Sequence, residues 1–90
     1  MTISISPIVA LNRAIAIAQS RGPDWGLEEI RSIADRERLA TYPFYFAAIG
    51  ELELRCGRRE TAREQFQTAL TLARNPMERQ FLGGRVSACE

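Results

Sequence analysis

The chain has 90 residues, of which 46% are hydrophobic and 26% are charged, and its formal net charge is +1. These values are typical of one small globular domain, so we expect a single domain over residues 1–90 that buries a modest core. No apolar run approaches the ~20 residues that a membrane-spanning helix needs. Because the N-terminus also lacks the basic start and long apolar centre of a signal peptide, we expect a cytoplasmic protein with no membrane partner.

Cysteine and histidine usage argues against a metal site and against catalysis. The chain has two cysteines, Cys56 and Cys89, and no histidine. A small secreted domain usually carries more bridges, and a structural zinc site needs about four ligands. The absence of histidine also removes the commonest general base. We therefore expect no metal, no cofactor and no disulfide framework.

All twelve basic residues are arginine. Arginine binds phosphate well, which suggests nucleic-acid recognition, but arginine-favouring codon usage in the genome explains the same observation. The eleven acidic residues are interleaved with the arginines, whereas a nucleic-acid binder usually shows a basic stripe. We expect no direct nucleic-acid binding, and an arginine-rich nucleic-acid binder stays open as an alternative.

Proline, glycine and capping residues mark the ends of five predicted helices. Ser6, followed by proline, is typical of an N-cap, and Gly22 ends the helix that starts there. Asn75, again followed by proline and with Glu78 three residues later, is a second start signal of this kind. No stretch shows a sustained two-residue strand period, so the predicted fold class is all-α. The helices are expected at about 7–20, 24–34, 43–55, 59–74 and 76–87.

These helices form two predicted antiparallel hairpins and a closing helix. Hairpin one covers about 7–34, hairpin two about 43–74, and the capping helix about 76–87. Residues 35–41 are charged and carry no apolar pattern, so we expect them to form a plain connection. Two similar helix pairs in succession indicate a repeat.

The second hairpin resembles the tetratricopeptide pattern W-x2-L-G-x2-Y…A-x3-F…P through Phe46-x2-Ile49-Gly50-x2-Glu53, Ala62-x3-Phe66, Ala69 and Pro76. Each residue type in the pattern has a packing reason. Gly50 and Ala62 are small, which lets the two antiparallel helices approach closely. Phe46 and Phe66 are large and fill the space on either side. The fold is therefore expected to be a tetratricopeptide-like array.

The resemblance has departures. Phe46 replaces the usual tryptophan, Glu53 replaces the usual tyrosine, and the closing proline comes about two residues late. In the first hairpin, either Gly26 or Leu27 takes the place of the small alanine. A bundle of helical hairpins without the repeat stays open as an alternative.

Several longer segments carry a more specific resemblance: Ser6-Pro7-Ile8-Val9-Ala10-Leu11-Asn12-Arg13-Ala14-Ile15-Ala16, Gly57-Arg58, Ala62-Arg63 and Asn75-Pro76-Met77-Glu78-Arg79-Gln80-Phe81-Leu82. Together they resemble the C-terminal extension of a group of bacterial extracytoplasmic-function (ECF) RNA polymerase sigma factors. The likeness covers roughly residues 6–82 and departs at Gly83 and Gly84, where such extensions usually keep a polar helix.

The resemblance implies a role in transcription that is indirect. In that family the extension is tetratricopeptide-like and follows the promoter-binding and polymerase-binding domains, which no part of this chain resembles. The expected partners are therefore proteins: other domains of the same factor, RNA polymerase or a regulator. A free-standing tetratricopeptide-like adaptor unrelated to transcription is the alternative.

Catalysis is not expected, and no catalytic residue is predicted. The serines and cysteines have no histidine to activate them. Cys56 lies near the C-terminal end of a predicted helix, where the helix dipole disfavours the thiolate.

Protein binding is the usual role of stacked helical hairpins, whose first helices line a concave face. The predicted groove would therefore lie on the first and third helices. Its candidate residues are Asn12, Arg13, Ala16, Gln19, Phe44, Ala47, Glu51 and Leu54.

The first helix is apolar on most sides, with stripes that include Ile8, Leu11 and Ile15. A helix of this kind needs burial on most sides, and a remaining exposed apolar patch commonly marks an interface. We expect these three residues to mediate self-association of the fragment as a homodimer, or packing against a preceding domain.

Overall fold

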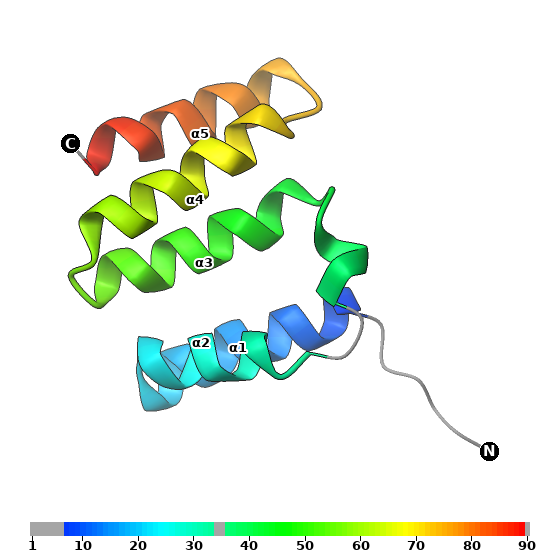
Figure 1. The fold of residues 1–90 in the computed structure, drawn as a ribbon, viewed down its shortest axis with the longest axis vertical. Helices are drawn as coiled ribbons and strands as arrows, with labels where there is room; N and C mark the ends of the chain where they lie inside the picture. Colours follow the sequence, from blue (N-terminus) through cyan, green and yellow to red (C-terminus); the bar gives the residue numbers. More distant parts are fainter. Residues whose placement is uncertain (1–6, 34–35, 90) are drawn as a thin grey trace.

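The computed structural model describes residues 7–33 and 36–89, which are all-helical and contain no strand. The helices are α1 (Pro7–Arg21), α2 (Pro23–Arg31), the short 3-10 helix η1 (Arg36–Leu39), α3 (Pro43–Arg55), α4 (Arg59–Thr71) and α5 (Pro76–Ala88). In Figure 1 they are stacked in chain order, with the α1–α2 hairpin at one end and α5 at the other. This arrangement confirms the predicted all-α fold of two antiparallel hairpins and a closing helix.

The turn inside the second hairpin is fixed by Gly57, whose φ of 84° lies in the left-handed region that favours glycine. The Gly57 amide donates to the Leu54 carbonyl at 3.0 Å, and the Arg58 amide donates to the Glu53 carbonyl at 2.9 Å. These two bonds satisfy carbonyls that the end of α3 would otherwise leave unpaired. The glycine stop signal in the sequence therefore corresponds to a Schellman turn.

The start of α5 also follows its sequence signal. Asn75 Oδ1 accepts a hydrogen bond from the Glu78 amide at 2.9 Å, which confirms the predicted N-cap. The Glu78 carboxylate in turn accepts from the Arg74 amide at 2.9 Å and from the Arg74 guanidinium at 3.1 Å. These bonds to Arg74 lower the pKa of Glu78 below its usual value.

The first hairpin is held by an apolar core between α1 and α2. Gly26 is buried at the point of closest approach, where an added Cβ would lie 2.5 Å from the Ala18 Cβ. Gly26, not Leu27, therefore takes the place of the small alanine. The core also receives one residue from α3; its members are Leu11, Ala14, Ala18, Leu27, Ile30 and Leu52.

The second hairpin is built around Phe66, which is fully buried. An added Cβ at Gly50 would lie 3.0 Å from the Phe66 ring, so the glycine makes room for the aromatic side chain. Ala62 is likewise fully buried, as the predicted close approach of the two helices requires. The core continues into α5 and comprises Ala47, Ala62, Phe66, Ala69, Leu82 and Cys89.

The two hairpins share one register with a 36-residue offset. The buried positions 14, 26 and 30 of the first hairpin correspond to positions 50, 62 and 66 of the second. The first set holds alanine, glycine and isoleucine, and the second holds glycine, alanine and phenylalanine. In each hairpin, two small residues at the contact between the helices are followed by one large apolar residue. The repeat consists of this packing pattern.

Some predicted boundaries differ from the structure. Helix α2 ends at Arg31, and α4 ends at Thr71, three residues before its predicted end. The segment expected to be a plain connection contains η1, which lies against α1 and whose Leu39 is buried. Leu39 is the only apolar side chain in η1, so the helical period that would have revealed it is missing. The predicted N-cap Ser6 and the predicted helical end at 34 lie outside the described residues.

Glu53, which stands where tyrosine is usual, is a buried acidic residue with 5% exposure. Its carboxylate accepts from Arg58 Nε at 2.6 Å and from Arg58 Nη2 at 3.2 Å. Arg58 also lies 3.6 Å from the Asp24 carboxylate at the start of α2. The bidentate pair holds the buried carboxylate of Glu53 at the α3–α4 turn. The contact of Arg58 with Asp24 links this turn to the first hairpin.

Cys56 lies in the same cluster, and its thiol donates to Asp24 Oδ1 at 3.3 Å. Burial and this hydrogen bond raise the pKa of the Cys56 thiol above its usual value. At neutral pH the thiol therefore stays protonated and is a poor nucleophile.

Candidate functional site

A hollow of about 280 Å³ lies between α1 and α3. Ile15, Ala48 and Leu52 form its apolar floor, and Gln19, Glu51 and Arg55 add polar groups to its wall. Because α1 and α3 are the first helices of the two hairpins, this α1–α3 hollow lies where the sequence placed the groove.

The structure brings two of the eight predicted groove residues, Gln19 and Glu51, into the hollow. Asn12, Arg13 and Ala16 are exposed on α1 but do not line it.

The three remaining candidates on α3 lie on the helix face that packs toward α4 and do not line the hollow. Ala47 is 6% exposed and belongs to the core with α4, and Phe44 and Leu54 are partly buried against the same core. The stripe that faces the hollow is instead Ala48, Glu51, Leu52 and Arg55. The predicted stripe was therefore about one residue out of phase, which rotates a helix face by about 100°. Apolar residues on both sides of α3 made the two stripes hard to tell apart in the sequence.

Glu51 is fixed in place by a charge from α5. Arg85 Nη2 donates to Glu51 Oε2 at 3.0 Å, and Arg85 Nε lies 2.6 Å from Glu51 Oε1. The Arg85 guanidinium also lies 5.5 Å from the Phe66 ring centroid, a cation–π geometry. Sequence reasoning missed Arg85, because only the fold reveals that α5 returns to α3.

The hollow has the chemistry of a peptide-binding surface. Its apolar floor can bury one or two aliphatic side chains, and the Gln19 amide can donate to and accept from a peptide backbone. Arg55 is exposed and can pair with a carboxylate. Since Arg85 already neutralises Glu51, the unneutralised charge at this wall is that of Arg55.

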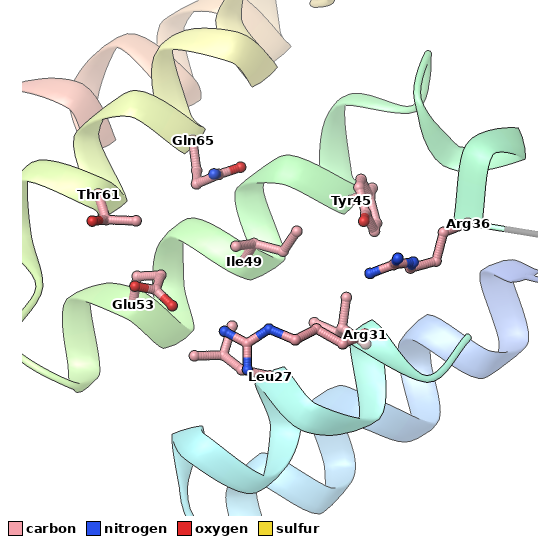
Figure 2. A pocket seen from close by; sticks show the side chains of 9 residues that line it. Leu27, Arg31, Arg36, Tyr45, Ile49, Glu53, Thr61 and Gln65 are labelled. Atoms are coloured by element: carbon pink, nitrogen blue, oxygen red, sulfur yellow. The ribbon is translucent and has the colours of Figure 1, made fainter. Parts of the chain in front are cut away.

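A second hollow of about 250 Å³ lies among α2, α3 and α4, beside η1. Figure 2 shows Arg31 and Arg36 on one side of it, with Thr61 and Gln65 on the other. Arg31 is paired with Glu28 at 2.8 Å. Glu53 also reaches this hollow, but its carboxylate is engaged by Arg58. No local sequence pattern predicts this hollow, because its wall combines residues from α2, η1, α3 and α4.

The residues predicted for self-association are separated by the fold. Leu11 is 2% exposed and lies in the core of the first hairpin, so its predicted place on an association surface is wrong. Ile15 lines the α1–α3 hollow, and Ile8 is exposed. Helices α2 and α3 cover most of the apolar surface of α1 for which the sequence predicted an external partner. Association through α1 stays a prediction, now supported by Ile8 and its neighbour Val9.

Carboxylates hold several of the arginines, including Arg31, Arg58, Arg74 and Arg85. Such pairing removes these charges from any patch that would face nucleic acid. Across 7–33 and 36–89 no cluster of three or more metal-ligating side chains occurs. No helix in the described ranges has both the length and the apolar character to cross a bilayer.

Comparison with known proteins finds a relative in a bacterium. A protein of Rhizobium meliloti (strain 1021) named "Uncharacterized protein R00370" is 36% identical over 77 residues. The matched region is 86% of this chain but only 18% of the relative, so the chain spans less than a fifth of that protein. No family model and no solved structure matches the chain.

Proposed function

We propose that this chain is a protein-interaction domain that binds partner proteins through the α1–α3 hollow. The observation that carries the proposal is the composition of the hollow, an apolar floor with polar groups from Gln19, Glu51 and Arg55. Stacked helical hairpins bind peptides and neighbouring domains on the face that their first helices line. A segment with an aliphatic anchor and a nearby carboxylate matches this surface.

The proposal extends to transcription initiation. In this role the chain is the C-terminal part of a bacterial ECF-type sigma factor, works in the cytoplasm and acts indirectly, through contacts with the rest of the factor, RNA polymerase or a regulator. The sequence resemblance over residues 6–82 supports this role. The much greater length of the Rhizobium meliloti relative is consistent with a domain that is attached to others.

Binding can be measured by titrating the 90-residue domain calorimetrically into two probes. The first probe is the promoter- and polymerase-binding segment of an ECF sigma factor from the same genome, and the second is core RNA polymerase. We expect Arg55→Glu to weaken binding about tenfold or more, because it reverses a charge at the wall of the hollow. Arg31→Glu, which makes the same change at the second hollow, is the matched control and should have little effect.

The outcomes separate the two parts of the proposal. If neither probe binds the wild-type domain, the role in transcription is wrong. If wild type and Arg55→Glu bind a probe equally well, the α1–α3 hollow is not the binding surface, and a loss with Arg31→Glu would assign binding to the second hollow.

A further inference from the structure

Helix α5 carries an apolar stripe that nothing in the described chain covers. It consists of Met77, Phe81, Gly84 and Ala88, whose spacing of four, three and four residues keeps them on one helix face. All four are exposed, with 82% exposure for Met77 and 52% for Phe81. Phenylalanine and methionine side by side on a helix surface indicate an interface.

The equivalent stripe is buried in α1 and α3, which are the first, or leading, helices of the two hairpins. In α3 it consists of positions 43, 47, 50 and 54, which lie 34 residues before the α5 stripe. The first three are buried and the fourth is partly buried, and positions 47, 50 and 54 pack in the core with α4. In α1 it consists of positions 7, 11, 14 and 18, of which the last three are buried in the core with α2. The stripe of α5 therefore corresponds in register to a surface that receives a helix.

The packing of α5 confirms this register. Leu82 and Val86 hold α5 against the preceding hairpin, and they lie 34 residues after Ala48 and Leu52, which hold α3 in the same way. Gly84 then corresponds to Gly50. An added Cβ at Gly50 would meet the Phe66 ring at 3.0 Å, whereas one at Gly84 has nothing within 4 Å. Gly84 thus offers the same space for an aromatic ring, and the space is empty.

The opposite end of the array differs. The α1 positions that would face a preceding hairpin are 9, 12, 13, 16 and 20, and all of them are exposed. They combine the polar residues Asn12, Arg13 and Ser20 with the apolar Val9 and Ala16, so this face is mixed, whereas the α5 stripe carries no polar side chain. The apolar face at the α5 end is therefore not a general property of array ends.

We propose that the α5 stripe binds the α5 stripe of a second copy of this chain, with the two helices antiparallel. The pattern is self-complementary: when Phe81 lies opposite Gly84 of the second copy, Met77 lies opposite Ala88. Each large side chain then faces a small one, and the two-fold axis repeats each contact twice. Along the two sides of the stripe, Glu78 of one copy lies beside Arg85 of the other and Gln80 lies beside Ser87, so no like charges meet. Phe81 fills the space at Gly84 as Phe66 fills the space at Gly50.

One helix pair is a small interface, so the expected association is weak and needs concentrations of tens of micromolar or more. Sedimentation velocity on the 90-residue chain from about 10 to about 300 µM should show a reversible monomer–dimer equilibrium. Phe81→Glu should raise the dissociation constant about 100-fold, because the symmetry removes both aromatic side chains at once.

Gly84→Leu provides a variant that keeps its fold. Since a side chain at position 84 meets nothing within the chain, helix content and melting temperature should be retained while association is lost. Ile8→Glu, at an exposed apolar residue of α1, separates this interface from the alternative association through α1. If the dimer forms through α5, this variant leaves the equilibrium unchanged.

A monomer at every concentration would overturn the proposal. The α5 stripe would then bind a helix that does not come from a second copy of this chain. A dimer that resists both α5 variants, or one that Ile8→Glu dissociates, would equally refute it. The latter result would support association through α1 instead. None of these outcomes depends on binding at the α1–α3 hollow, so this proposal and the proposed function fail independently.

Discussion

Phe66→Ala is expected to lower the free energy of unfolding by about 3–5 kcal/mol, the usual cost of truncating a fully buried phenylalanine. Phe66 has 0% exposure, contacts Gly50 of α3 and lies in the core that the second hairpin shares with α5. Because Gly50 has no side chain to move into the vacated space, the cavity should collapse little. A domain of this size has a total stability of roughly 5–13 kcal/mol, so the variant should be close to unfolding at physiological temperature.

Urea denaturation followed by circular dichroism measures this loss. Trp25→Ala is the control, because Trp25 is 54% exposed and its ring lies on the surface beside the Arg21 guanidinium, 5.5 Å from the ring centroid. The control should cost less than about 1 kcal/mol. Equal losses for the two variants would contradict the packing described for the second hairpin.

Glycine-to-alanine substitutions at Gly26 and Gly84 are expected to have opposite effects on stability. In an exposed helix interior this change stabilises by about 0.5–1 kcal/mol. At Gly26 the new Cβ would lie 2.5 Å from the Ala18 Cβ and 3.1 Å from the Ala14 carbonyl oxygen. The backbones of α1 and α2 must then separate, so we expect a net loss of about 1–3 kcal/mol. At Gly84 nothing lies within 4 Å, so we expect the gain.

Both melting curves should be recorded at a few micromolar, where dimers of the proposed kind are dissociated. The sign of the difference is the informative quantity. A Gly26→Ala variant as stable as Gly84→Ala would mean that α1 and α2 do not approach closely, and the repeat register of the first hairpin would then be wrong.

The helices could be predicted from the sequence because their ends carry local chemical signals. Prolines start α2, α3 and α5, and Gly22 and Gly57 adopt positive φ values between helices. The close contact of the second hairpin was predictable as well, since the small residues Gly50 and Ala62 stand at fixed distances from Phe66. These features depend only on residues near one another in the chain.

Features that depend on tertiary contacts could not be predicted in this way. The hollow-facing stripe of α3 was placed one residue early, because this helix has apolar residues on the face toward α4 and on the face toward the first hairpin. The Glu51–Arg85 pair joins positions 34 residues apart and has no local pattern. The bare stripe of α5 becomes visible only when its register is compared with that of α1 and α3.

The proposed function and the proposed dimer use different surfaces of the array. The α1–α3 hollow lies between the leading helices of the two hairpins, whereas the α5 stripe lies at the end of the stack. A dimer formed through α5 would leave both hollows open, so two copies could bind two partner segments at once.

Mapping the binding surface by nuclear magnetic resonance tests the central claim most directly. The ¹⁵N-labelled domain is titrated with the promoter- and polymerase-binding segment of an ECF sigma factor from the same genome. The account predicts that the largest shift changes fall on amides lining the α1–α3 hollow, including Gln19, Glu51 and Arg55. No shift changes, or changes confined to the hollow around Arg36, Thr61 and Gln65, would contradict it.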